Sequence, residues 1–135
     1  MKNLITILSL IGLLWTGTAL AQEPAIPWPD RYAASFGLGL QRDPEGKILI
    51  IKVDSTGEAA MKGLVPGNEL LGWNQLPAGR ALAKIRVRPY RKLFPEWDDD
   101  RIRLVLLTRG RPGETAEVFV MTATGNNRGI KLTAK

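Results

Sequence analysis

The sequence predicts one mainly β domain with two short helices, an α+β fold. Hydrophobic residues make up 44% of the 135 residues and charged residues 24%, which is the balance of a folded globular chain. Residues 47–53 (KILIIKV) form an apolar, β-branched run, and residues 101–109 and 115–123 alternate apolar with polar side chains. Both patterns are typical of strands.

The absence of histidine and cysteine excludes several function classes. Neither residue occurs in the chain, so imidazole bases, thiol nucleophiles, disulfides and the usual zinc and haem ligands are ruled out. We therefore expect no cofactor and no metal. Beyond residue 21 only Ser35 and Ser55 are serines, and neither stands in a G-x-S-x-G nucleophile turn. We expect the protein not to be an enzyme.

The first 21 residues predict an export signal. Lys2 precedes an apolar run at 4–14, and residues 19–21 (ALA) supply the small-x-small pattern that signal peptidase accepts. The apolar run is shorter than the about 20 residues that span a bilayer. We expect cleavage after Ala21 and a periplasmic or secreted mature protein. An uncleaved membrane anchor and an N-terminal core helix are the alternatives.

The remaining chain predicts one domain between two loose segments. Residues 22–31 contain three prolines, which indicate a stiff, extended linker. Residues 125–135 begin with glycine and asparagine and are expected to form a flexible C-terminal tail. The domain is then expected at residues 32–124.

Two strands and a helix are predicted in the first half of this domain. Residues 47–53 are expected to form a strand buried on both faces. A short helix is expected at 56–62, with Thr56 as its cap and Gly63 ending it in the left-handed conformation. Residues 69–73 predict a second strand.

A hairpin is predicted in the second half. Residues 110–113 (GRPG) would join the strands at 101–109 and 115–123. The apolar face of the first of these strands would bury Leu104 and Leu106.

The segment from 75 to 100, which precedes this hairpin, is ambiguous. Residues 81–87 fit either a helix or a strand. Pro89 suits the first turn of a helix that continues to Phe94 and stops at Pro95.

Residues 36–40 (FGLGL) carry the main functional signal. Gly37 and Gly39 alternate with Leu38 and Leu40 just before a strand pattern. Glycine lets the backbone turn with its N–H groups pointing into one cavity, and such a set of donors binds a carboxylate. The leucines would line an apolar pocket beside it. A glycine-rich turn between strands is the alternative.

The order of these motifs resembles that of a PDZ domain. GLGL at 37–40 is followed by KILIIKV, by GEAAMKGL at 57–64 and by PGNELL at 66–71. The resemblance covers about residues 32–123, and the variant is similar to those attached to bacterial periplasmic proteases and secretion-system components. It implies a small, partly open, PDZ-like β-barrel or sandwich.

The resemblance also implies a binding mechanism. A peptide would add as a strand, with its terminal carboxylate on the N–H groups of residues 38–40. Leu93 or Phe94 from an opposing helix would complete the apolar pocket. Arg31 stands upstream of the loop, where a cation of the family assists the carboxylate; a solvated linker charge is the other interpretation. The histidine that selects Ser or Thr in one PDZ class is absent, so that specificity is not expected.

Two charged segments favour a solvated surface over a site. Residues 98–100 are three aspartates, but consecutive carboxylates rarely converge on one cation. The basic run at 84–92 suits an anionic surface or an acidic protein, and the export signal argues against nucleic acid.

The sequence thus predicts an exported module that binds C-terminal or extended peptide segments by strand addition. The expected partners are a peptide or protein C-terminus and an envelope protease or secretion component. Nucleic acid is not expected, and a membrane is expected only through an uncleaved signal. The alternative is a structural docking or regulatory subunit of such a complex, with the groove unused.

Overall fold

The computed structural model describes residues 26–135. The expected export signal and the first four residues of the expected linker lie outside them. No helix in this described part is long and apolar enough to cross a bilayer.

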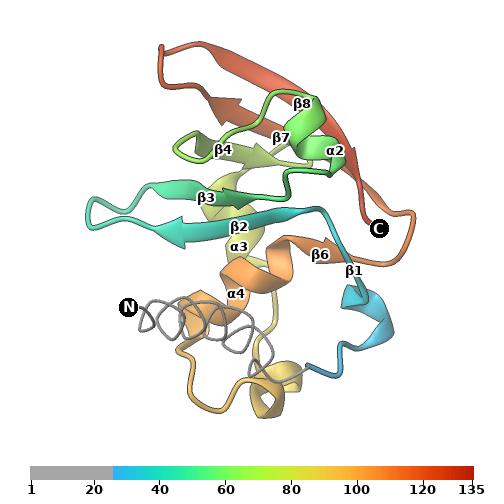
Figure 1. The fold of residues 1–135 in the computed structure, drawn as a ribbon. Coiled ribbons are helices and arrows are strands. Elements are labelled where there is room, and N and C mark those ends of the chain that lie inside the picture. The colour runs from blue at the N-terminus through green and yellow to red at the C-terminus, as the bar shows by residue number, and fades with distance from the viewer. Residues whose placement is uncertain (1–25) are drawn as a thin grey trace, which may run out of the picture.

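An open antiparallel sheet forms the body of the domain (Figure 1). Its strand order is β2-β3-β4-β7-β8, with β5 paired to β4, while β1 and β6 form a separate small ladder. The strands are β1 (Ala34–Ser35), β2 (Leu38–Arg42), β3 (Ile48–Val53), β4 (Glu69–Trp73), β5 (Leu76–Pro77), β6 (Arg109–Gly110), β7 (Thr115–Met121) and β8 (Asn127–Thr133). The fold is the small α+β, PDZ-like arrangement that the sequence predicts.

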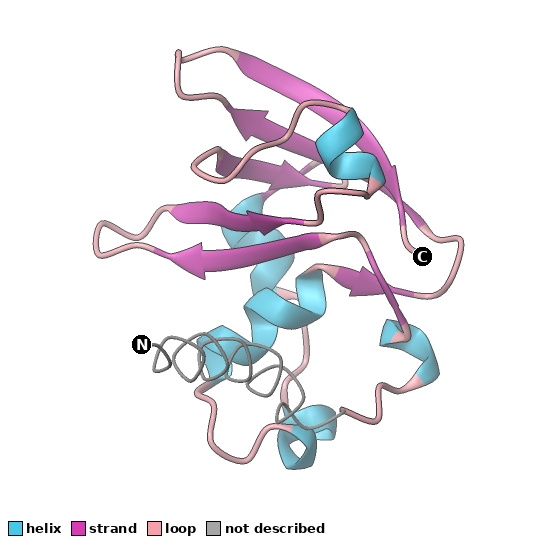
Figure 2. Ribbon diagram, viewed as in Figure 1, coloured by secondary structure: helices cyan, strands magenta, loops and turns pink. Residues whose placement is uncertain are grey.

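Short helices cover one side and one end of this sheet. They are α2 (Glu58–Met61), α3 (Ala78–Ala83) and α4 (Asp99–Leu107), with the 3-10 helices η1 (Asp30–Tyr32) and η2 (Arg88–Leu93). Figure 2 shows α3 and α4 on the same side of the sheet, whereas α2 lies at the far end beside β8. α4 packs next to β2, which is one of the two strands at the ends of the order β2-β3-β4-β7-β8.

Two apolar clusters hold the fold together. The larger one lies between the sheet and the helices and includes Ile50, Val118 and Leu132. The smaller one lies on the other side of α4, around Phe94 and the 0%-exposed Ile102. Because α4 supplies residues to both clusters, its position is fixed from two sides.

Several predicted elements are confirmed. β3 and β4 match the expected strands at 47–53 and 69–73. Gly63 ends α2 with φ +92°, and Pro89 stands in the first turn of η2. The expectation that the strand at 47–53 is buried on both faces is wrong, because Ile51 in β3 is 49% exposed.

The hairpin predicted from 101–109 and 115–123 is wrong. Residues 99–107 form α4, and β7 pairs with β4 and β8 instead. The side chain of Asp98 accepts a hydrogen bond from the Arg101 N–H, which is the capping contact that starts a helix. Leu104 and Leu106 are buried as expected, but on a helix and in different clusters.

The flexible tail predicted at 125–135 is also wrong. Residues 127–133 form β8, which pairs with β7 along its whole length. Ile130, Leu132 and Ala134 alternate into the core. The hydrogen bonds between Lys135 and Ser35 then tie the end of the chain to β1.

The described part of the predicted linker belongs to the domain. The Trp28 ring lies 5.7 Å from that of Phe94, centroid to centroid, and Ile26 packs on the same cluster. Residues 30–32 form η1. These apolar contacts hold residues 26–31 against the small cluster, so they pack as part of the folded domain.

Candidate functional site

A groove of about 660 Å³ separates β2 from α4. Gly39 and Leu40 line its strand wall, and Leu104 and Val105 line its helix wall. Trp97 closes the bottom near the start of α4. The walls offer apolar contact along the middle of the groove and charged groups at its ends.

The outer edge of β2 presents unpaired backbone groups to this groove. The Asp54 N–H donates to the Gly37 carbonyl, so Gly37 faces β3 and the next residue, Leu38, faces outward. The Ile50 N–H donates to the Asn68 carbonyl, and the Ile50 carbonyl accepts from the Gly67 N–H, just before β4 begins. The cross-strand partner of Ile50, Leu40, therefore also faces outward. Leu38 and Leu40 therefore offer the donors and acceptors that an added strand needs.

The other edge of the sheet, β8, is covered by α2. The Thr133 N–H donates to Glu58 Oε1 at 2.7 Å, and Lys62 Nζ donates to the Lys131 carbonyl at 2.6 Å. Arg128 Nη2 in turn donates to the Lys62 carbonyl. Side chains that occupy an edge in this way block strand addition. Of the two edges, β2 is the open one.

This cover on β8 gives the domain a predictable acid response. The hydrogen bond from Lys62, followed by the one from the Thr133 N–H, lowers the pKa of Glu58. A lowered pKa contributes stability above the unfolded-state value, and this contribution is lost as the pH falls through the folded-state value. We expect the urea midpoint of the wild type to fall more steeply below about pH 4.5 than that of Glu58→Gln. Equal slopes for the two proteins would contradict this.

An ion pair spans the groove at its far end. Arg42 Nε and Nη2 donate to the two carboxylate oxygens of Asp100 at 3.0 and 2.9 Å. These bonds lower the pKa of Asp100 and raise that of Arg42. The Arg101 guanidinium lies 3.9 Å from the centroid of the Trp97 ring. The charges at this end of the groove are therefore already engaged.

The structure places the predicted loop residues at the opposite end. Gly37 has φ +81° and donates its N–H to Ser35 Oγ at 2.9 Å. The Leu38 side chain is buried in the large cluster, while Leu40 is partly buried beside it. Gly39 pairs across to Lys52, so its N–H does not share the outward direction of its neighbours. Gly37 is the glycine of this loop that adopts the left-handed conformation.

The structure does not bring Leu93 and Phe94 to the groove. Phe94 is 3% exposed in the small cluster, and its ring stacks behind Trp97 at 4.8 Å between centroids. The opposing helix is α4, and Leu104 and Val105 take the expected place. Arg31 is also engaged elsewhere, in an ion pair with Glu114 at 3.0 Å. The cap at Asp98 was the sequence signal for α4.

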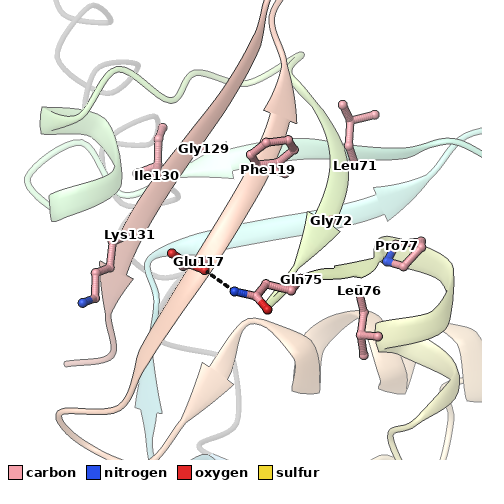
Figure 3. A pocket seen from close by; sticks show the side chains of 10 residues that line it. All are labelled: Leu71, Gly72, Gln75, Leu76, Pro77, Glu117, Phe119, Gly129, Ile130 and Lys131. Carbon is pink, nitrogen blue, oxygen red and sulfur yellow. Dashed lines mark hydrogen bonds between the residues drawn. The ribbon is translucent and has the colours of Figure 1, made fainter.

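A second pocket of about 610 Å³ lies over β4, β7 and β8 (Figure 3). The exposed Phe119 ring forms part of its apolar lining. Two of its polar groups bond to each other, since Gln75 Nε2 donates to Glu117 Oε1 at 3.3 Å. Lys131 is the remaining charged residue of the lining. The described residues also contain no group of three or more side chains suited to hold a metal.

Comparison with known proteins shows a similar fold at low sequence identity. No family model and no curated protein matches the chain. Mature CPAF is 12% identical with a TM-score of 0.53, over 78% of this chain and 21% of its own. The photosystem II D1 C-terminal processing protease is 15% identical with a TM-score of 0.52, over 76% and 23%. The chain thus spans about a fifth of these proteins.

A smaller solved structure also matches. It is the PDZ domain of a carboxy-terminal protease from Vibrio cholerae in complex with a peptide, 18% identical with a TM-score of 0.48, over 76% of this chain and 93% of its own. At these identities the likenesses concern the fold alone.

Proposed function

We propose that this protein is an exported peptide-binding module that captures C-terminal or extended peptide segments in the groove between β2 and α4. The open outer edge of β2 carries this proposal, because it faces a groove while the β8 edge is covered. The fold likeness to a C-terminal processing protease supports a role beside proteins that act on chain ends. We propose a binding role and not a catalytic one.

The peptide would add antiparallel to β2. Its main chain would bond to Leu38 and Leu40, and alternate side chains would point toward α4. The terminal carboxylate would lie at the 37–40 loop, where the strand begins. An apolar last side chain would pack between Leu40 and Val105. Main-chain bonds give affinity in this mode, and the pocket gives specificity.

A display library of peptides with free C-termini tests this proposal. We expect binding of sequences with an apolar last residue. Val105→Lys should lower the affinity for the tightest selected peptide at least about tenfold. The substitution places a charged ammonium group in the apolar wall, and peptide binding would have to remove water from that charge. Val65→Lys is the matched control, since Val65 is 51% exposed and lies away from the groove.

Titration by fluorescence anisotropy, with circular dichroism to verify folding, measures both variants. Equal weakening by the two variants, or no selected peptide at all, would contradict groove binding. The second result would favour a docking or regulatory subunit of an envelope protease or secretion complex, with the groove unused.

A further inference from the structure

We propose that Lys52, which crosses β2 over Gly39, is the cation that receives the terminal carboxylate of the bound peptide. This inference rests on the proposed function and names a residue for it. Lys52 and Gly39 are direct partners in the β2–β3 ladder. A Cβ built on Gly39 would lie 3.1 Å from Lys52 Cβ and 3.9 Å from Lys52 Cδ. The lysine side chain therefore runs against the bare Cα of Gly39.

This path carries the Lys52 side chain alongside β2, the strand with the open edge. Gly39 stands between Leu38 and Leu40, the two residues whose backbone faces outward. Lys52 lines both the groove and the adjoining hollow at Gly37 and Leu38. A carboxylate bonded to the start of β2 would lie within the region that this flexible side chain can reach.

The other basic groups around the groove are already engaged. Arg31 is paired with Glu114 and Arg42 with Asp100, and Arg101 is stacked on Trp97. Lys52 is exposed, and no ion pair of it occurs among the described residues. It is the cation that remains available for an incoming anion.

The carboxylate that lines this hollow, Asp54, does not form an ion pair with Lys52. Asp54 shares the hollow with Gly37 and Lys52. Its Oδ1 accepts hydrogen bonds from the N–H and the hydroxyl of Thr56, each at 3.1 Å. The Asp54 charge is therefore directed into its own turn. The two acids of the groove, Asp98 and Asp100, are the helix cap and the Arg42 partner.

The same geometry explains why residue 39 is a glycine. Its φ is not in the left-handed region, which only Gly37 occupies in this loop. A side chain at residue 39 would instead meet Lys52 at 3.1 Å, tighter than ordinary packing. Glycine at this position leaves the path of the lysine clear.

Lys52→Met tests the assignment with one peptide in two forms. The probe is the tightest peptide of the free-C-terminus library, used as the free acid and as the C-terminal amide. We expect Lys52→Met to lower the affinity for the free-acid peptide about tenfold. This is the low end of the effect of a hydrogen bond to a charged group, and we choose it because the lysine is exposed. The amide should bind the wild type and Lys52→Met equally. Lys52→Arg should keep the preference for the acid.

Lys47→Met is the control for a lost surface charge. Lys47 is exposed on the same hairpin and pairs only with Glu45, at 3.7 Å, so both peptide forms should keep their affinity. Equal weakening of acid and amide by Lys52→Met, or no weakening, would overturn the role of Lys52. Equal affinity of the wild type for acid and amide would overturn it too. In each case the Val105→Lys variant tests the groove separately. Weaker peptide binding by this variant would still support the groove as the binding site, whereas unchanged binding would contradict it.

Discussion

A chain that ends at Gly125 is expected to lose its cooperative fold. β8 supplies Ile130, Leu132 and Ala134 to the large cluster. Its removal also leaves β7 without the partner that pairs with all seven of its residues. Two buried aliphatic side chains stabilise a fold by about 1.5–3 kcal/mol each. When the lost β7–β8 hydrogen bonds are included, the loss approaches the whole free energy of unfolding of a typical domain, about 5–15 kcal/mol.

Near-ultraviolet circular dichroism and urea unfolding measure this effect. The shortened chain should show no cooperative transition. In the full-length protein, Leu132→Ala should cost about 2–5 kcal/mol. The exposed neighbour Lys131→Ala should stay within about 0.5 kcal/mol of the wild type. A shortened chain with a wild-type transition would restore the flexible-tail interpretation.

The sequence contains a strand pattern for β8, but the location of these residues at the chain end led to the prediction of a flexible tail. Ile130, Leu132 and Ala134 alternate with polar residues, which is a strand pattern. Chain ends are usually loose unless they join a sheet, and the Gly125-Asn126 start strengthened that expectation. Pairing with β7 decides the matter, and pairing is a long-range contact that local composition does not reveal.

The strand predicted at 101–109 failed for a different reason. Ile102, Leu104 and Leu106 alternate as in a strand, yet Ile102 and Leu106 are also one helical turn apart. A short apolar run fits both periods. The cap at Asp98 and the adjacent Leu107, which a one-sided strand would expose, favour the helix.

The candidate site was predictable on one side only. The FGLGL run at 36–40 is a local feature that singles this segment out in the sequence, and the structure places residues 38–40 at the start of β2. The opposite wall is α4, which packs beside β2. Because the sequence predicts a strand at residues 101–109, the helix expected on this side of the site is a different one, at Leu93 and Phe94. The role proposed for Lys52 could not be predicted from the sequence. Its position depends on the β2–β3 register, which pairs it with Gly39.

Replacing Ile102 and Leu106 by alanine is expected to be strongly destabilising and non-additive. Both side chains are 0% exposed, so each substitution should cost about 2–5 kcal/mol. Both lie in the small cluster, one turn apart on α4. Residues that share a packing site couple by about 0.5–3 kcal/mol.

Leu104→Ala supplies the comparison that separates a helix from a strand. Leu104 is buried in the large cluster, on the other side of α4, so its effect should add to that of Ile102→Ala within about 0.5 kcal/mol. In a strand, residues 102, 104 and 106 would share one face and all three pairs would couple. Urea unfolding of the single and double variants measures the two coupling energies. Coupling of Ile102 to Leu104 as strong as its coupling to Leu106 would contradict the helix. It would also remove the helical wall that Leu104 and Val105 give to the groove.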